Sequence, residues 1–320
     1  MANGKSVEAV NALQSSFENL KTEIKKIVYG QDEVIEQVLT ALFSQGHCLL
    51  IGVPGLAKTL LVNTISKSLG LQHNRIQFTP DLMPSDIIGA EILDETRRFQ
   101  FIKGPIFTNV LLADEINRTP PKTQSALLEA MQEYAVTAAG KHYKLDEPFF
   151  VLATQNPIEQ EGTYPLPEAQ LDRFMFSIML DYPSVEDEIT IVKNTTSDNN
   201  IEVNSVISKE QIIAYQKLIR KIPVNNSVLE YAVKLSSATR PDGVNAAAAS
   251  KKYLKWGAGP RASQYLVLGA KAHAAIHGKY SPDIEDIQAV AKNILQHRII
   301  KNYVAEAERI SVNDIINELL

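Results

Sequence analysis

Apolar residues recur at spacings of three and four along the start of the chain, which is the period of an amphipathic helix. One such stripe runs from Val7 to Ile27, and Tyr29-Gly30 ends it. A second stripe begins near Asp32, which we interpret as an N-cap, and stops near 45–46. The sequence therefore predicts two consecutive helices ahead of the first continuous apolar run.

Short continuous apolar runs then alternate with helical patterns, which is typical of buried parallel strands joined by helices. The predicted strands are 47–51, 75–79, 109–116, 149–156 and 174–180. The predicted helices between them are 60–69, 122–133 and 166–174. Residues 91–107, with Asp94-Glu95, and residues 136–145 alternate as β-hairpins do. The pattern predicts an α/β fold with a mostly parallel sheet covered on both faces.

Beyond Tyr182-Pro183 the pattern is helical only, so we place a domain boundary there. This predicts an α/β domain over 1–182 and an all-helical domain over 183–320. A polar, asparagine-rich connector covers 194–205, and the alanine run at 246–249 remains unassigned. The predicted helices are 209–221, 227–238, 261–277 and 281–302.

Composition supports a soluble globular protein with room for two cores, because the chain has 320 residues and 45% apolar content. The net charge of −5 and a pI of about 5.8 disfavour nucleic acid as a partner. Cys48 lies within an apolar run and is interpreted as a small buried hydrophobe. Neither a signal core nor a membrane-spanning run is found, so we expect no membrane insertion and a cytoplasmic location.

The candidate chemistry begins in the loop after the first predicted strand. Its glycines allow backbone N–H groups to turn toward phosphates, while Lys58 reaches the outer phosphates and the Thr59 hydroxyl ligates Mg²⁺. The helix that follows directs its positive end at the same anions. Ala57 departs from the general pattern, which has a glycine before the lysine. The residues predicted to bind nucleotide here are Gly52, Val53, Pro54, Gly55, Leu56, Ala57, Lys58, Thr59 and Leu60.

Polar residues end two further buried strands. In an open α/β sheet the ligand lies beyond the carboxyl ends of the strands, so Asp114 and Glu115 should emerge beside the phosphate loop. We expect Asp114 to hold Mg²⁺ through water, and Glu115 to orient and polarise the attacking water. Asn156 ends the next strand and could bind the γ-phosphate or that water; the alternative is a turn residue before Pro157.

One other pair has metal-ligand spacing. His273 and His277 stand at i and i+4, as in helical zinc sites. The intervening residues include no glutamate base, and the sequence indicates no third ligand. The pattern therefore favours two partly exposed histidines on a helix over a metal site.

Several of these motifs together resemble the MoxR family of AAA+ ATPases, and the resemblance extends along nearly the whole chain. In this family the alanine before the lysine looks normal. The resembling segments are 52–59 (Gly-Val-Pro-Gly-Leu-Ala-Lys-Thr), 111–118 (Leu-Leu-Ala-Asp-Glu-Ile-Asn-Arg), 121–131, 153–157 (Ala-Thr-Gln-Asn-Pro), 166–174 and 259–263 (Gly-Pro-Arg-Ala-Ser).

The resemblance implies an AAA+ core with inserted hairpins, a helical lid, and a hexameric ring with nucleotide between subunits. It implies that Asn156 is the first sensor, Arg261 the second sensor on the lid, and Arg173 the finger that completes a neighbour's site. For Arg173 the alternative is a surface ion pair with Asp172 or Glu168. On the adenine side, the resembling contacts are Tyr29, Gly30 and Gln31.

The leading hypothesis is Mg²⁺-dependent ATP hydrolysis that drives chaperone-like remodelling of a client protein, with ATP and Mg²⁺ as cofactors. The resemblance also implies partners that carry von Willebrand factor A domains. A second hypothesis is a nucleotide-gated binding module with little turnover. A third is a DNA-processing motor, which the acidic balance disfavours.

Overall fold

The computed structural model describes residues 4–93, 95, 97–158, 162–197 and 201–320. Asp94 in the first predicted hairpin lies outside the described residues, as do residues 198–200 of the predicted polar connector.

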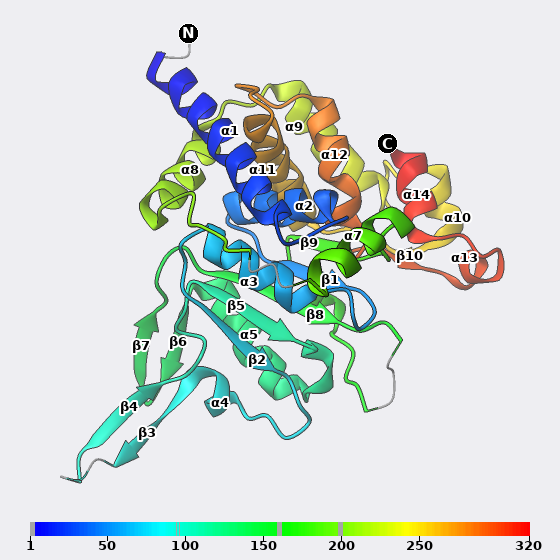
Figure 1. The fold of residues 1–320 in the computed structure, drawn as a ribbon. Helices are drawn as coiled ribbons and strands as arrows, with labels where there is room; N and C mark the ends of the chain where they lie inside the picture. Colours follow the sequence, from blue (N-terminus) through cyan, green and yellow to red (C-terminus); the bar gives the residue numbers. More distant parts are fainter. Residues whose placement is uncertain (1–3, 94, 96, 159–161, 198–200) are drawn as a thin grey trace.

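A five-stranded parallel sheet forms the centre of the first part of the chain (Figure 1). Its spatial order is β2-β5-β8-β1-β9, so each neighbour is reached by a crossover. All four pairings are parallel, which confirms the α/β fold predicted from the alternating pattern. The strands are β1 Cys48–Ile51, β2 His73–Gln77, β5 Val110–Asp114, β8 Phe150–Gln155 and β9 Phe176–Met179.

Each face of the sheet packs against its own apolar cluster, because successive side chains along a strand point to opposite faces. Leu50, Leu112 and Leu152 belong to one cluster, and their chain neighbours Leu49 and Val151 belong to the other. The first cluster includes helices α1 (Gly4–Lys25), α2 (Asp32–Phe43) and α3 (Lys58–Ser68). The second includes α5 (Pro121–Glu133). Cys48 is fully buried in the first cluster, as predicted.

Two hairpins project from the sheet, as the alternating patterns predicted (Figure 1). One pairs β3 (Gly89–Leu93) with β4 (Phe99–Lys103), and the other pairs β6 (Ala135–Ala138) with β7 (Lys141–Lys144). The shorter connecting elements are α4 Pro84–Ile88, η1 Ile116–Arg118 and α6 Glu168–Leu171.

After β9 the described chain is mostly helical, and much of it packs on the α1–α2–α3 side of the sheet (Figure 1). Helix α11 contacts α1, α2, α8, α9 and α12. The elements are α7 Val185–Thr195, α8 Lys209–Lys221, α9 Asn226–Ala238, α10 Ala248–Tyr253, β10 Leu254–Trp256, α11 Pro260–Ile276, α12 Ile284–Leu295, β11 Ile300–Lys301, α13 Tyr303–Ala307 and α14 Val312–Leu319. Among the described residues, every helix is too short or too polar to span a lipid bilayer.

Several predicted element boundaries were wrong, and the predicted helix 166–174 is helical only over α6. The predicted helix 281–302 ends at Leu295, and the chain then pairs as β11 with β10, so the C-terminal part is not helical only. Asp32 does not cap α2; it is the first residue of that helix, and its carboxylate binds Lys25 at 2.7 Å. A carboxylate in the first turn still interacts favourably with the helix dipole.

Candidate functional site

The candidate site lies at the edge of the sheet where three parallel strands end. The loop 52–57 leaves β1, Asp114 is the last residue of β5, and Asn156 follows β8. Because β8 lies between β1 and β5 in a parallel sheet, these residues emerge at the same edge. The structure thus brings together the three groups that the sequence placed at strand ends.

Close packing fixes the path of the loop. A Cβ atom added to Gly52 would lie 2.7 Å from the Cβ of Leu180, closer than side chains tolerate. Gly55 has a φ of +90°, a conformation that glycine adopts without a steric penalty. Leu56 is buried, and its carbonyl accepts a hydrogen bond from Gln31 Nε2 at 3.1 Å. The two glycines are therefore needed for two different reasons.

The alanine that departs from the general phosphate-loop pattern takes a conformation normally reserved for glycine. Ala57 has a φ of +54° in the left-handed region and is the N-cap of α3. For a residue with a Cβ atom this costs roughly 1–2 kcal/mol. The loop thus keeps the backbone shape of a glycine loop and stores a small strain at its junction with the helix.

This strain predicts that Ala57→Gly is tolerated. Relief of the left-handed strain should offset the greater backbone entropy of glycine, so the free energy of unfolding should change by less than about 1 kcal/mol. The matched control is Ala126→Gly inside α5, which should destabilise by about 1 kcal/mol because its backbone is already helical. Urea unfolding of both variants measures the difference. Equal destabilisation would contradict the strain assignment.

Lys58 is the first residue of α3, and its side chain points back toward the loop that precedes the helix. Lys58 Nζ donates a hydrogen bond of 2.5 Å to the carbonyl oxygen of Gly52. Partial burial lowers the pKa of Lys58, while the nearby Asp114 and Glu115 carboxylates act in the opposite direction. Thr59 is partly buried in the first turn of α3. A cation and the N-terminus of α3 thus adjoin the same loop, and the first N–H groups of a helix have no partner within the helix, which suits a polyphosphate.

A threonine contacts the Asp114 carboxylate and the backbone of Glu115. Thr154 Oγ1 donates to Asp114 Oδ1 at 2.6 Å and accepts from the Glu115 backbone N–H at 2.8 Å. Arg75 Nη2 lies 2.7 Å from Asp114 Oδ2. Each carboxylate oxygen has two lone pairs, so Asp114 retains acceptor capacity for a water of a metal shell.

Glu115 has a left-handed backbone, with a φ of +57°, which turns it away from the strand. Its Oε2 atom accepts from Gln77 Nε2 at 2.9 Å and lies 3.1 Å from Arg118 Nε. Arg75 and Gln77 were not among the residues predicted for this site. Their i, i+2 spacing on a strand was a signal that both side chains share one face, but only the strand order places that face beside β5.

The Asn156 side chain is buried, and only one of its two polar atoms has a hydrogen-bond partner among the described residues. Its Oδ1 atom accepts from the Ile158 backbone N–H at 3.1 Å, whereas its Nδ2 atom finds no partner among the described residues. A buried donor without an acceptor costs about 1–3 kcal/mol, so such groups usually await a ligand or water. A phosphate oxygen or the attacking water would satisfy it.

The two predicted arginines have different surroundings. Arg261 is the second residue of α11, after Pro260, and its Nη1 atom lies 3.0 Å from Asp172 Oδ2. The Arg173 side chain makes no hydrogen bond or ion pair with any described residue. The ion pair that we considered as the alternative for Arg173 is absent, because Asp172 binds Arg261 and Arg298 instead.

Arg298 is a buried anchor that the sequence did not reveal. Its Nε atom donates to Asp172 Oδ1 at 2.7 Å, and Nη2 donates to the Asp172 carbonyl at 2.9 Å. Burial lowers the pKa of this guanidinium, and the Asp172 carboxylate opposes that shift. The side chain also lies over the ring of Tyr265. The segment that carries Arg173 is thereby tied to the C-terminal helices.

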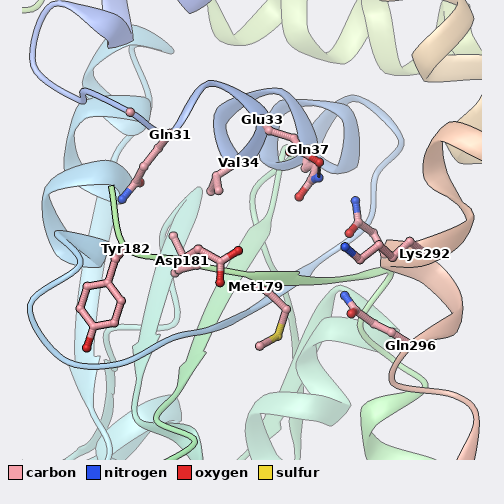
Figure 2. Close-up of a pocket in the computed structure, with 12 residues that line it drawn as sticks. Gln31, Glu33, Val34, Gln37, Met179, Asp181, Tyr182, Lys292 and Gln296 are labelled. Carbon is pink, nitrogen blue, oxygen red and sulfur yellow. Dashed lines mark hydrogen bonds between the residues drawn. The ribbon is translucent and has the colours of Figure 1, made fainter. Parts of the chain in front are cut away.

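Beside the loop, a pocket opens between the start of α2, the end of β9 and α12. Figure 2 shows Gln31 and Val34 on one side, Met179 and Tyr182 below them, and Lys292 on the far helix α12, with Gln296 just past its end. Gly30 and Gln31 line this pocket. Tyr29 does not; its hydroxyl donates to the Lys26 carbonyl at 2.6 Å, and the residue lines a neighbouring hollow. The pocket has the position expected for the base of a nucleotide.

These observations fit ATP and Mg²⁺ to the site. The loop offers backbone donors and the Lys58 cation, Asn156 offers an orphaned donor, and the pocket adjoins the loop at Gln31. Thr59 and Asp114 supply oxygen atoms of the kind that Mg²⁺ prefers.

Comparisons with known proteins point to the same chemistry. One family model, the ATPase family associated with various cellular activities (AAA), matches residues 47–176, and an AAA lid domain model matches residues 246–319. The chain is similar to Chaperone MoxR1 of Mycobacterium tuberculosis, with 41% identity over 98% of this chain and 83% of the relative. It is 42% identical to YeaC of Bacillus subtilis over 93% of this chain and 91% of that protein.

A solved structure is also similar. The crystal structure of a candidate ATPase from Cytophaga hutchinsonii superposes with a TM-score of 0.91 and 45% sequence identity. The match covers 98% of this chain and 95% of the other.

Proposed function

The chain belongs to the MoxR family of AAA ATPases, and we propose that it hydrolyses ATP with Mg²⁺ to remodel a client protein. One observation carries the proposal of hydrolysis. The phosphate loop, the Asp114-Glu115 pair and the half-satisfied Asn156 meet at one edge of the sheet. A site that only held nucleotide would need the loop but not a carboxylate placed to activate water.

Each residue of the site would have a role in hydrolysis that follows from its chemistry. Lys58 and the loop N–H groups neutralise and orient the phosphates, while Thr59 and Asp114 would hold Mg²⁺. Bound Mg²⁺ would supply Lewis-acid stabilisation of charge on the phosphate oxygens. Glu115 would accept a proton from the attacking water, and Asn156 Nδ2 would donate to that water or to the γ-phosphate. Gly30 and Gln31 would contact the base, with Tyr29 at its border.

Two arginines would complete the site from different subunits. Arg261 would act in its own subunit, after leaving Asp172. Arg173 has no described partner and would reach the nucleotide of a neighbour, so we propose a closed ring, as a hexamer. The boundary between nucleotide-binding domain and lid stays a proposal at residues 182–183.

The client role rests on similarity. The relative from Mycobacterium tuberculosis is named a chaperone, which supports remodelling of other proteins as the output of hydrolysis. A partner with a von Willebrand factor A domain remains a further proposal from the family resemblance.

A nucleotide-gated binding module with little turnover is the second candidate. Gln77 and Arg118 both bind the Glu115 carboxylate. A carboxylate held by two partners must break these contacts before it can activate the attacking water, which would keep turnover slow. Steady turnover that a partner stimulates would favour remodelling. Tight retention of nucleotide with no turnover, even with partners present, would favour the module.

The proposed metal role predicts the behaviour of Asp114→Ala. Because Asp114 would act on Mg²⁺ through water, the Mg²⁺ concentration for half-maximal phosphate release should rise roughly 10–100-fold. Titration of Mg²⁺ at fixed ATP measures this, with the exposed Asp146→Ala as the matched control. An unchanged titration for Asp114→Ala would contradict the assignment. Absence of Mg²⁺-dependent phosphate release from the wild type, alone and with partners, would contradict the ATPase proposal itself.

A further inference from the structure

A second group of chemically active side chains lies away from the nucleotide site, where α11 crosses α2. His273 lies in the last turn of α11 and His277 is its C-cap residue, and the centroids of their rings lie 4.3 Å apart. Glu36 of α2 faces them. One ligand atom from each of the three residues lies within 4.8 Å of the others. The helical spacing alone predicts two partly exposed histidines with no third ligand, because Glu36 belongs to a distant segment of the chain.

The hydrogen bonds of both imidazoles leave the same nitrogen free. His273 Nδ1 lies 2.7 Å from Asp286 Oδ1, and His277 Nδ1 lies 2.8 Å from the carbonyl oxygen of His273. Both partners are acceptors, so each Nδ1 carries the proton. In the neutral ring Nε2 then presents its lone pair. Metal-binding histidines are typically fixed in this way, by a carboxylate or a carbonyl on the other nitrogen.

Glu36 is also oriented. Lys21 Nζ lies 2.7 Å from Glu36 Oε2, which leaves Oε1 to face the histidines. Glu36 Oε1 is 3.6 Å from His277 Nε2. In a tetrahedral zinc site, with metal–ligand distances of about 2.0–2.1 Å, ligand atoms are roughly 3.3 Å apart. Small side-chain rotations would bring the three ligand atoms to that spacing.

We propose that Glu36, His273 and His277 form a binding site for a divalent transition metal ion, of which Zn²⁺ fits best. Two imidazoles and one carboxylate suit Zn²⁺, and a water would take the fourth position. Mg²⁺ prefers a shell of oxygen atoms, so the ion of the nucleotide site does not compete well here. The site is therefore separate from the ATPase chemistry in place and in metal preference.

The location gives such an ion a mechanical role. Helix α2 begins beside the nucleotide pocket, and α11 begins at Pro260, next to Arg261. The two helices already pack together, so the ligands are held near each other before an ion arrives. A bound ion would clamp the helix bordering the nucleotide pocket to the helix that carries Arg261.

Direct metal binding tests the proposal. Metal-free full-length protein is titrated with ZnCl₂ by calorimetry, without nucleotide and with excess Mg²⁺ present; Co²⁺ absorption reports tetrahedral geometry. We expect one Zn²⁺ per chain. Glu36→Gln and His277→Gln should each bind at least tenfold more weakly. Asp286→Asn should lose roughly 10–100-fold, because it removes the carboxylate that orients His273. The exposed His142→Gln is the matched control and should bind as the wild type does.

His277→Gln decides the test if Asp286→Asn fails to fold, because His277 is exposed and its loss should leave circular dichroism unchanged. Three outcomes would overturn the proposal. They are no stoichiometric Zn²⁺ on the wild type, unchanged affinity in His277→Gln and Glu36→Gln, or an equal loss in His142→Gln. The first or second would mean that Glu36 and His277 are only polar neighbours at the protein surface.

Discussion

Lys58→Ala should abolish ATP binding, whereas Glu115→Gln should bind ATP and fail to hydrolyse it. The lysine ammonium neutralises phosphate charge already present in the bound ground state. Removing one partner of such a charge pair costs about 2–5 kcal/mol, or roughly 30-fold or more in affinity. Glu115 acts on the water, so its loss should lower turnover by about 10²–10⁴-fold and leave affinity nearly intact.

Two measurements separate the variants. Fluorescent ATP binding gives affinity, and phosphate release gives turnover. Lys67→Ala in the same helix is the matched control for the loss of a lysine and should retain both. Equal loss of ATP binding in Lys58→Ala and Glu115→Gln would contradict the assignment of binding to Lys58 and of hydrolysis to Glu115.

Arg173→Ala should bind ATP normally but hydrolyse it poorly. An arginine finger stabilises charge that develops mainly in the transition state and contributes roughly 10³–10⁵ in turnover. Its guanidinium has no partner among the described residues, so the substitution breaks no ion pair seen in the structure. Arg261→Ala, in contrast, should impair the site of its own subunit and release Asp172 from one of its two arginines.

Mixing two inactive variants tests whether Arg173 acts in a neighbour. In a mixed ring of Arg173→Ala and Lys58→Ala subunits, some interfaces join an intact loop to an intact arginine. Activity above the sum of the separate proteins would support a shared site. Mixing Lys58→Ala with Glu115→Gln provides the control, because both defects lie in the same half of the site. No recovery in mixtures shown by light scattering to have co-assembled would mean that Arg173 is structural or acts within its own subunit.

The central sheet and the phosphate loop were predictable because their signals are local. The buried strand, the glycines and Lys58 follow one another along the sequence, so a short window is enough to recognise them. The same holds for the strand that ends in Asp114. In a parallel sheet the carboxyl ends of neighbouring strands also lie at the same edge. The structure accordingly brings Lys58, Asp114 and Asn156 together, as the sequence predicted.

The partners of these residues were not predictable, because they depend on strand order and on how distant segments pack. Arg75 reaches Asp114 only because β2 lies beside β5. Arg298 and Glu36 face residues far away in the chain, and helical periodicity says nothing about which helix a side chain will meet. The early end of α12 has the same origin, since the pairing of β11 with β10 interrupts a continuous helical pattern.

The apolar cluster above the sheet limits how the C-terminal helices could move. Leu39 and Leu42 of α2 share this cluster with Leu266 and Ala270 of α11, and Gln216 of α8 donates to the Leu42 carbonyl at 2.8 Å. A hinge-like swing about residues 182–183 would expose that shared surface to water, at about 25 cal/mol for each Å² of apolar area. Any nucleotide-driven motion should therefore be a shear, in which packed helices slide by an ångström or two and stay in contact.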